Sequence, residues 1–173
     1  MHFSASILDI GCGNSKLSED LYEDGYNNLT SVDISGIVIG QMQEYYKEKI
    51  PSIKFEKADI RDMRPLFNED ELFDVVLDKG TLDSILCGDS SGPNTDKALK
   101  EIYRVLKPNG VYICMTYGLP DQRLEIFKRP EFRWSPIIHK VTKTTISTQQ
   151  VVAAEDKNDK NFHYIYILKK LEA

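Results

Sequence analysis

The order of segments along the chain places the tightest constraint on its fold. Short apolar runs at residues 7–10, 29–33 and 73–77 have the length and composition of buried strands. Residues 17–22 and 38–46, which follow the first and second runs, carry apolar side chains at helical spacing. Strands that alternate with helices in this way predict an α/β fold built around a parallel sheet.

The second half of the chain continues this alternation and then departs from it. Residues 53–56 alternate as a half-buried strand, 96–106 carry an apolar stripe at helical spacing, and 111–115 are apolar throughout, as in a central strand. After a further helical stretch, strand-like runs at 137–146 and 162–168 follow each other without a helix between them. Such strands pair in antiparallel fashion, so we predict a mostly parallel α/β sheet that ends in an antiparallel hairpin.

Length and composition limit the class of protein. The chain has 173 residues, the size of one domain, and its net charge of −5 argues against partners such as nucleic acid or an anionic membrane. Its three cysteines form no CxxC pair, so the sequence indicates neither a metal site nor a disulfide framework. The first residues lack the features of a signal peptide, and every apolar run is far shorter than a membrane span. We expect a single domain over residues 1–173 in the reducing cytoplasm.

Glycines and acids stand where the predicted parallel strands end, which is where ligands bind in such sheets. Gly11 and Gly13 follow the first strand and allow a tight turn that a ligand can approach closely. Asp33 lies twenty residues past Gly13, and its carboxylate suits the two hydroxyls of a ribose, with a helix cap as the alternative. Lys16 stands where a dinucleotide fingerprint has its third glycine, which argues against NAD.

The next two strand ends carry further acids. Asp59 can accept a hydrogen bond from the amine of adenine, and Ile60 can pack on the ring; a loop acid beside a core isoleucine is the alternative. Asp78, Lys79 and Asp83 gather after the fourth strand and indicate a polar ligand there. The alternatives are a surface pair of Asp78 with Lys79, and a place for Asp83 in the first turn of a helix.

These stretches together resemble the class I S-adenosylmethionine-dependent methyltransferases. Within that class, the chain is most similar to the methyltransferase-like protein lysine methyltransferases, which include relatives that modify translation elongation factor 1-alpha. The matching stretches are Ile7–Ser15 (ILDIGCGNS), Thr30–Ile34 (TSVDI), Phe73–Ser84 (FDVVLDKGTLDS), Tyr103–Gly110 (YRVLKPNG) and His163–Lys169 (HYIYILK). The resemblance covers nearly the whole chain and implies a Rossmann-like sheet of seven strands.

The resemblance also implies S-adenosyl-L-methionine as the cofactor and a protein substrate as the partner. It assigns roles to nine residues at the strand ends: Asp9, Gly11 and Gly13 beside the methionine part of the cofactor, Asp33 on the ribose, Ile34, Asp59 and Ile60 at the adenine, and Asp78 and Lys79 near the transferring methyl group and the substrate entrance. Methylation of a small molecule and a non-catalytic binding module are the alternatives to methylation of a protein lysine.

Two features depart from the family pattern. In the family, a segment before the first strand, often rich in aromatic residues, helps to close the cofactor site, whereas only six residues precede Ile7 here. We therefore expect the chain as given to lack this lid and to be a weak catalyst even when it binds cofactor. Residues 147–160 form a longer connection than the family's last hairpin loop, and we assign them no role.

A lysine acceptor has to lose a proton before methyl transfer, which costs about 4.6 kcal/mol at pH 7. A carboxylate beside the amine would raise the pKa of that amine, so Asp78 is expected to position the acceptor rather than to act as a strong base. His139 and His163 are expected to face solvent from the C-terminal hairpin. Three aromatic residues are expected to pack in the core or to wall a substrate channel: Tyr117, Phe132 and Trp134.

Overall fold

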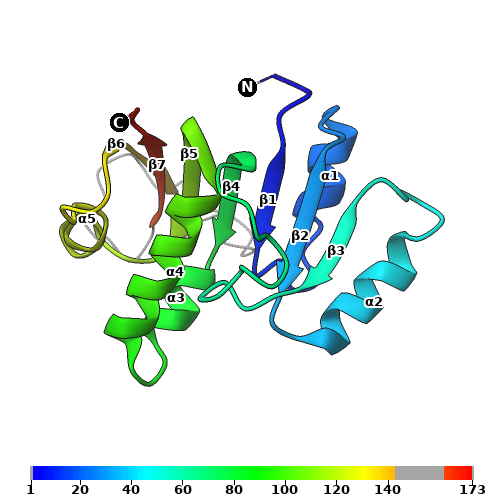
Figure 1. Ribbon diagram of the computed structural model, residues 1–173, viewed down its shortest axis with the longest axis horizontal. Helices are drawn as coiled ribbons and strands as arrows, with labels where there is room; N and C mark the ends of the chain where they lie inside the picture. The colour runs from blue at the N-terminus through cyan, green and yellow to red at the C-terminus, as the bar shows by residue number, and fades with distance from the viewer. Residues whose placement is uncertain (1, 143–161, 173) are drawn as a thin grey trace, which may run out of the picture.

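A computed structural model describes residues 2–142 and 162–172, and its centre is one sheet of seven strands (Figure 1). The strands lie in the order β3-β2-β1-β4-β5-β7-β6. The first five strands in this order are parallel to one another, whereas β7 is antiparallel to both of its neighbours. Their bounds are β1 Ile7–Ile10, β2 Leu29–Asp33, β3 Lys54–Lys57, β4 Phe73–Lys79, β5 Leu106–Thr116, β6 Trp134–Thr142 and β7 Phe162–Lys170. The predicted parallel sheet with an antiparallel hairpin is confirmed.

Five helices connect these strands in the described part of the chain: α1 Leu17–Glu23, α2 Gly36–Tyr46, α3 Thr81–Leu86, α4 Ser91–Val105 and α5 Pro120–Phe127. The sequence analysis offered a helix here only as an alternative for Asp83, which does lie in the first turn of α3; six residues make less than two turns and show no periodicity. Helix α4 begins five residues before its predicted start at residue 96. Pro93 falls in its first turn, where the missing N–H leaves no helical hydrogen bond unmade.

The sheet separates two apolar cores because neighbouring residues of a strand face opposite sides. Leu8 and Val76 face the side covered by α3, α4 and α5, whereas Ile7 and Val75 face the side covered by α1 and α2 (Figure 1). Both faces are covered, so β1 is buried along its whole length and β4 is buried from Val75 to Asp78.

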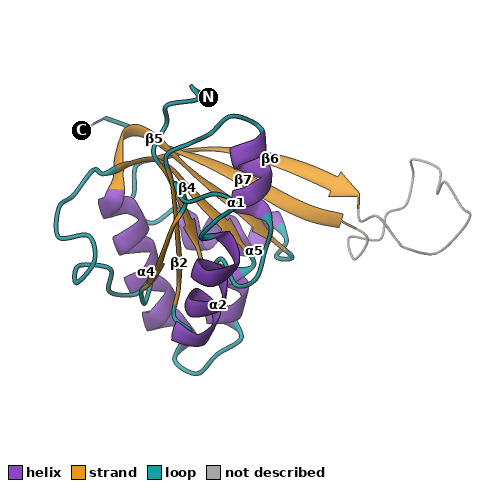
Figure 2. Ribbon diagram, turned by 90° about the vertical axis from the view of Figure 1, so that its right-hand side faces the viewer, coloured by secondary structure: helices purple, strands orange, loops and turns teal. Residues whose placement is uncertain are grey.

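The C-terminal hairpin extends past the helices, as Figure 2 shows. Its two strands pair from Trp134 with Lys170 to Thr142 with Phe162. Residues 143–146 of the predicted strand and the segment 147–160 lie outside the described residues. Within the described residues, no helix has both the length and the apolar composition needed to cross a lipid bilayer.

The order of the strands places a reversal point beside β1. The chain runs outward from β1 through β2 to β3, then returns to β4 on the other side of β1 and continues to β5. At such a point the loops that leave the carboxyl ends of neighbouring strands diverge to opposite faces and open a crevice. Of the glycines and acids singled out in the sequence, Gly11, Asp33 and Asp59 lie around this crevice.

Candidate functional site

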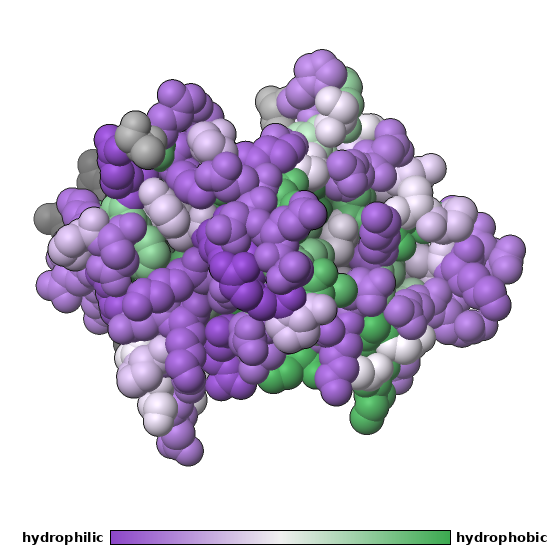
Figure 3. Space-filling view, in the orientation of Figure 1, coloured by the Kyte–Doolittle hydropathy of each residue, from purple (hydrophilic) through white to green (hydrophobic). Residues whose placement is uncertain are grey.

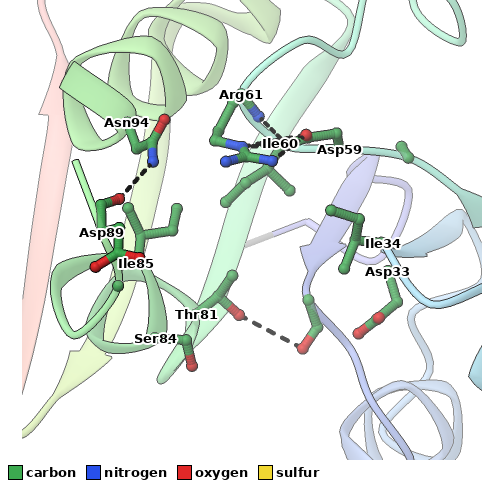
Figure 4. A pocket seen from close by; sticks show the side chains of 13 residues that line it. Asp33, Ile34, Asp59, Ile60, Arg61, Thr81, Ser84, Ile85, Asp89 and Asn94 are labelled. Atoms are coloured by element: carbon green, nitrogen blue, oxygen red, sulfur yellow. Dashed lines mark hydrogen bonds and ion pairs between the residues drawn. The ribbon is translucent and has the colours of Figure 1, made fainter. Parts of the chain in front are cut away.

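A cavity of about 470 Å³ opens at the carboxyl ends of β1 to β4. Segments that follow all four strands line it, together with α3 and the start of α4: Gly11, Asp33, Ile34, Ala58, Asp59, Ile60, Arg61, Thr81, Ser84, Ile85, Gly88, Asp89 and Asn94. In Figure 4, Asp33 and Ile34 lie on one side, Ile85, Asp89 and Asn94 on the opposite side, and Asp59 to Arg61 between them. Hydrophilic residues cover most of the face seen in Figure 3, and apolar residues show mainly between the α4 and α2 sides.

The glycine turn after β1 is held by hydrogen bonds from both sides. Gly11 and Gly13 have φ angles of +62° and +53°, a region that favours glycine. The Thr81 hydroxyl donates to the Ile10 carbonyl at 2.9 Å, and the backbone N–H of Gly13 donates to the Asp33 carboxylate at 3.0 Å. Asp33 is therefore joined directly to the turn.

Asp33 also bonds to the segment that follows it. One carboxylate oxygen accepts from the Ser35 N–H at 2.9 Å, and the Ser35 side chain caps α2 through the N–H of Val38. The helix cap is thus Ser35, and Asp33 shapes the loop before the helix while lining the cavity. Ile34 is 59% exposed beside it, which leaves its side chain available to an apolar ring.

The segment after β3 contributes an acid that the sequence analysis singled out and a base that it missed. Arg61 donates to both oxygens of Asp59, with Nε 2.9 Å from Oδ1 and Nη2 2.6 Å from Oδ2. This bidentate bond is the main cause that lowers the pKa of Asp59 below its usual range. Ile60 is buried but still lines the cavity between them.

Asp9 lies beneath the glycine turn and is only 4% exposed. It accepts a hydrogen bond from Ser18 at 3.4 Å, and the Ser18 hydroxyl also lies 2.7 Å from the Ser31 hydroxyl. Burial, the largest effect, raises the pKa of Asp9 to about 7; the charge of Lys79 lowers it and that of Asp78 raises it. Asp9 is therefore a buried acid that gains a proton close to neutral pH.

Asp78 occupies a different environment from the one its sequence position implied. It is 2% exposed and accepts hydrogen bonds from the Tyr112 hydroxyl at 2.8 Å and the Thr81 N–H at 2.8 Å, with Leu82 N–H at 3.2 Å. Burial raises its pKa to about 6, against the effect of these hydrogen bonds. These bonds hold the start of α3 against β5, and the carboxylate does not reach the cavity. Lys79 is exposed at the end of β4.

The methyltransferase domain family matches residues 2–168. The chain belongs to this methyltransferase family. A structure of a SAM-dependent methyltransferase from Methanosarcina mazei superimposes with a TM-score of 0.75 at 17% identity, covering 100% of this chain and 95% of that one. This likeness concerns the fold and confirms its Rossmann-like class.

Two relatives of the methyltransferase are closer in sequence. It is 41% identical over 137 residues to EEF1A lysine methyltransferase 4 of Mus musculus, covering 75% of this chain and 52% of the mouse protein. It is 38% identical over 154 residues to eEF1A lysine and N-terminal methyltransferase of Homo sapiens, covering 86% of this chain and 21% of the human protein. The matched region thus spans about half of the mouse relative and about a fifth of the human one.

The family and fold imply S-adenosylmethionine as the cofactor, and the cavity of this methyltransferase fits such a molecule. Its volume lies in the range of sites for ligands of that size. A Cβ at Gly13 would meet no atom within 4 Å, so the turn leaves open space beside its backbone. Asp33 and Asp59 place carboxylates at the lining of the cavity, and Ile34 and Ile60 place apolar surface there.

The sequence analysis missed the wall of the site that α3 and α4 form. Ser84, Ile85 and Gly88 line the cavity from α3 and its end, and Asp89 and Asn94 line it from the loop and the start of α4. The Asn94 amide donates to the Asp89 carbonyl at 3.1 Å and joins the two parts of this wall. One signal was available in the sequence: the stretch Phe73–Ser84, one of those that carry the family resemblance, ends inside α3.

The histidine and aromatic candidates lie in three environments: on an exposed edge strand, in the apolar core, and at the carboxyl end of β5. His139 is exposed on the edge strand β6, as expected. Phe132 is buried and Trp134 packs on it with ring centroids 5.9 Å apart, in the core on the α4 side of the sheet. Tyr117 lies at the carboxyl end of β5, with its ring centroid 4.9 Å from that of His163. Of these aromatic side chains, only Tyr117 is placed to meet a substrate at this edge.

Proposed function

We propose that the chain transfers a methyl group from S-adenosylmethionine to a lysine side chain of a protein. The observation that carries the proposal is one cavity in which the glycine turn, Asp33, and the pair Asp59 and Ile60 converge from three different strand ends. This combination suits a nucleoside with an amino-acid end. The relatives named above support a lysine as acceptor and translation elongation factor 1-alpha as the substrate to test.

When bound, the cofactor supplies an electrophilic methyl group on a sulfonium. The acceptor nitrogen uses its lone pair to form the new N–C bond as the S–C bond breaks, and that bond's electron pair leaves with the sulfur. The acceptor's proton passes to water. The protein's main task is to hold donor and acceptor in line at close approach. Asp33 and Asp59 line the cavity and would hold the nucleoside end, and Asp9 is buried in the strand that leads into the glycine turn, beside which the amino-acid end would lie.

We propose for Asp78 a positioning role of a different kind from the one expected. Its carboxylate is occupied by Tyr112, Thr81 and Leu82, so it orients α3 and does not meet an incoming ammonium. Loss of a proton from a lysine costs about 4.6 kcal/mol at pH 7, and removal of the amine from bulk water lowers that cost. A substrate channel that excludes water therefore contributes more than a nearby acid would.

The acidic net charge of −5 supports a protein partner rather than nucleic acid. The three cysteines are free thiols, two of them buried, which supports a reducing compartment such as the cytoplasm. We therefore also propose a protein partner and a cytoplasmic location for the chain.

The first test measures binding of S-adenosylhomocysteine by calorimetry. Asp33→Ala is expected to weaken binding by about ten- to a hundred-fold, because charge-assisted hydrogen bonds to a ribose contribute about 1.5–3 kcal/mol. Asp33→Asn keeps one oxygen for the loop and is expected to lose less. Asp62→Ala, an exposed acid that does not line the cavity, is the matched control and is expected to bind as the wild type does. Equal affinity of Asp33→Ala and the wild type would remove the ribose assignment.

The second test follows a radiolabelled methyl group into cell extract and into purified elongation factor 1-alpha. A labelled protein band that maps to lysine supports the proposal. A labelled small metabolite would instead support a small-molecule methyltransferase. Binding of S-adenosylhomocysteine without any transfer would support a non-catalytic binding module.

A further inference from the structure

Asp83, in the first turn of α3, bonds to the segment that leaves β5. Its carboxylate accepts from the Thr116 hydroxyl, from the backbone N–H of Tyr117 at 3.0 Å and from Nη2 of Arg123 at 2.7 Å. The side chains of Asp83 and Arg123 are 16% and 12% exposed. Burial raises the pKa of Asp83, but these hydrogen bonds outweigh burial and hold the pKa below its usual range. The carboxylate therefore remains charged at neutral pH.

Further bonds fix the same segment from its other side. The Thr116 hydroxyl oxygen accepts from the Gly118 N–H at 3.1 Å and from Nε of Arg123 at 3.0 Å. The Tyr166 hydroxyl donates to the Gly118 carbonyl at 2.8 Å. Arg123 packs so closely on Gly118 that a Cβ there would lie 2.1 Å from its guanidinium carbon. The backbone on both sides of residue 117 is thus held by buried bonds.

The side chain at the centre of this rigid segment points to the surface. Tyr117 is 64% exposed, although its backbone is fixed, and its ring lies against His163 of β7. Lys79, the last residue of β4, pairs with Met115, so Tyr117 lies just past the point where β4 and β5 end together. The packing of the apolar core does not require an aromatic ring at this position.

The position matters if the chain has the proposed function, on which this inference rests. The acids that suit a nucleoside follow β2 and β3, on one side of the glycine turn. The ends of β4 and β5 lie on the other side of the reversal point. An acceptor in line with the breaking bond approaches from the side that the nucleoside leaves open, which is the side of Tyr117.

We infer that Tyr117 contacts the acceptor lysine and forms one wall of the channel through which that side chain reaches the methyl donor, and that Asp83, with Thr116 and Arg123, is the positioning group that fixes Tyr117. A tyrosine ring has two properties that suit this task. Its face attracts the incoming ammonium, and its apolar surface packs on the lysine methylenes and excludes water as the proton leaves. Because Asp83, Thr116 and Tyr166 hold the backbone of this segment, that backbone need not become ordered when substrate binds.

The test compares methylation of elongation factor 1-alpha by variants of the full chain, at saturating S-adenosylmethionine. Tyr117→Ala is expected to lower kcat/KM for the protein acceptor by about ten- to thirty-fold. Tyr117→Phe, which keeps the ring, is expected to stay within about threefold of the wild type. S-adenosylhomocysteine affinity is expected to remain within about twofold in both, because Tyr117 does not line the cofactor cavity. Tyr45→Ala is the matched control, because it removes a tyrosine of α2 that is 50% exposed.

A double-mutant cycle tests the positioning role of Asp83. Asp83→Asn alone is expected to lower kcat/KM, and to cause little further loss when combined with Tyr117→Ala, because both changes remove the same contact. Fully additive losses would assign Asp83 a structural role only and overturn that part of the inference. An active wild type with an equally active Tyr117→Ala would overturn the acceptor contact alone. A wild type that binds S-adenosylhomocysteine but methylates no protein lysine would overturn the proposed function and the acceptor contact with it.

Discussion

Replacement of Asp9 by asparagine is expected to make the protein more stable at pH 8 while weakening its affinity for the cofactor. Asp9 is 4% exposed, and burial raises its pKa from 3.8 to about 7. A carboxylate charge that is buried without a cationic partner destabilises the folded chain. Buried carboxyl groups of this kind are retained for binding rather than for stability. The variant separates the two effects because asparagine has nearly the same shape and no charge.

The sign of the pH dependence follows from the two pKa values. The folded chain keeps a proton on Asp9 up to about pH 7, whereas the unfolded chain releases it near pH 4. Between these values the folded state binds more protons, so the free energy of unfolding falls as pH rises through this window. The upper bound of this loss is about 4 kcal/mol. We expect Asp9→Asn to be about 1–3 kcal/mol more stable than the wild type at pH 8, with a much smaller difference at pH 5.

Denaturant unfolding at pH 5, 6, 7 and 8 measures this difference, and titration calorimetry measures binding of S-adenosylhomocysteine. Binding is also expected to weaken, because the family resemblance places Asp9 beside the methionine part of the cofactor, behind the glycine turn. Asp78, whose pKa is also raised by burial, titrates in both chains, and its charge raises the pKa of Asp9 in the wild type alone. A stability difference that is the same at pH 5 and pH 8 would show that the charge of Asp9 is not its cause.

Asp74→Asn is the matched control, since it makes the same change near the start of β4, at the opposite edge of the sheet. Partial burial raises the pKa of Asp74, but hydrogen bonds from Ser6 and Lys107 outweigh this and hold the pKa below its usual range. A lowered pKa gives stability that is present above about pH 4 and lost as pH falls. Asp74→Asn is therefore expected to destabilise the chain at pH 8 and to leave cofactor binding unchanged.

The parts of the fold and site that the sequence predicted well share a local cause. The parallel strands β1 to β4 are short runs with buried apolar residues, and a glycine or acid stands at the end of each or within two residues of it. The position of such a residue along the chain therefore predicts its position in the site. Gly11, Asp33, Ile34, Asp59 and Ile60 all line the cavity for this reason.

The parts that the sequence did not predict depend on contacts between distant segments. Arg61 lines the cavity because it turns back onto Asp59, and nothing in its neighbours indicates that rotamer. Asp78 follows its strand just as Asp33 does, yet Tyr112, 34 residues later, captures its carboxylate in the core. The two acids have the same local pattern, and their different burial is decided by the strand that packs beside each.

The largest loss of stability among single changes in the glycine turn is expected for Gly11→Ala. A Cβ at Gly11 would lie 2.1 Å from Oγ1 and 2.7 Å from Cγ2 of Thr81, and the φ angle of +62° strains any L side chain. Thr81 cannot simply turn away, because its hydroxyl bonds to the Ile10 carbonyl at 2.9 Å. Strain and overpacking together are expected to destabilise the chain by about 2–5 kcal/mol. For a chain of this length, that lowers the Tm by about 5–15 °C.

Gly13→Ala is the matched comparison, because its φ of +53° is almost the same but a Cβ there meets nothing within 4 Å. Only the backbone strain of about 1–2 kcal/mol is expected, and cofactor affinity still falls because the methyl group enters the space beside the turn. A second variant, Gly11→Ala with Thr81→Gly, removes the atoms that clash and is expected to be more stable than the sum of the two single changes predicts. Thermal unfolding of Gly11→Ala, Gly13→Ala, Thr81→Gly and the double variant, with and without S-adenosylhomocysteine, measures the changes in stability and in cofactor binding. Equal losses of stability for Gly11→Ala and Gly13→Ala would mean that Thr81 gives way, and that the contact between the turn and α3 does not fix the floor of the site.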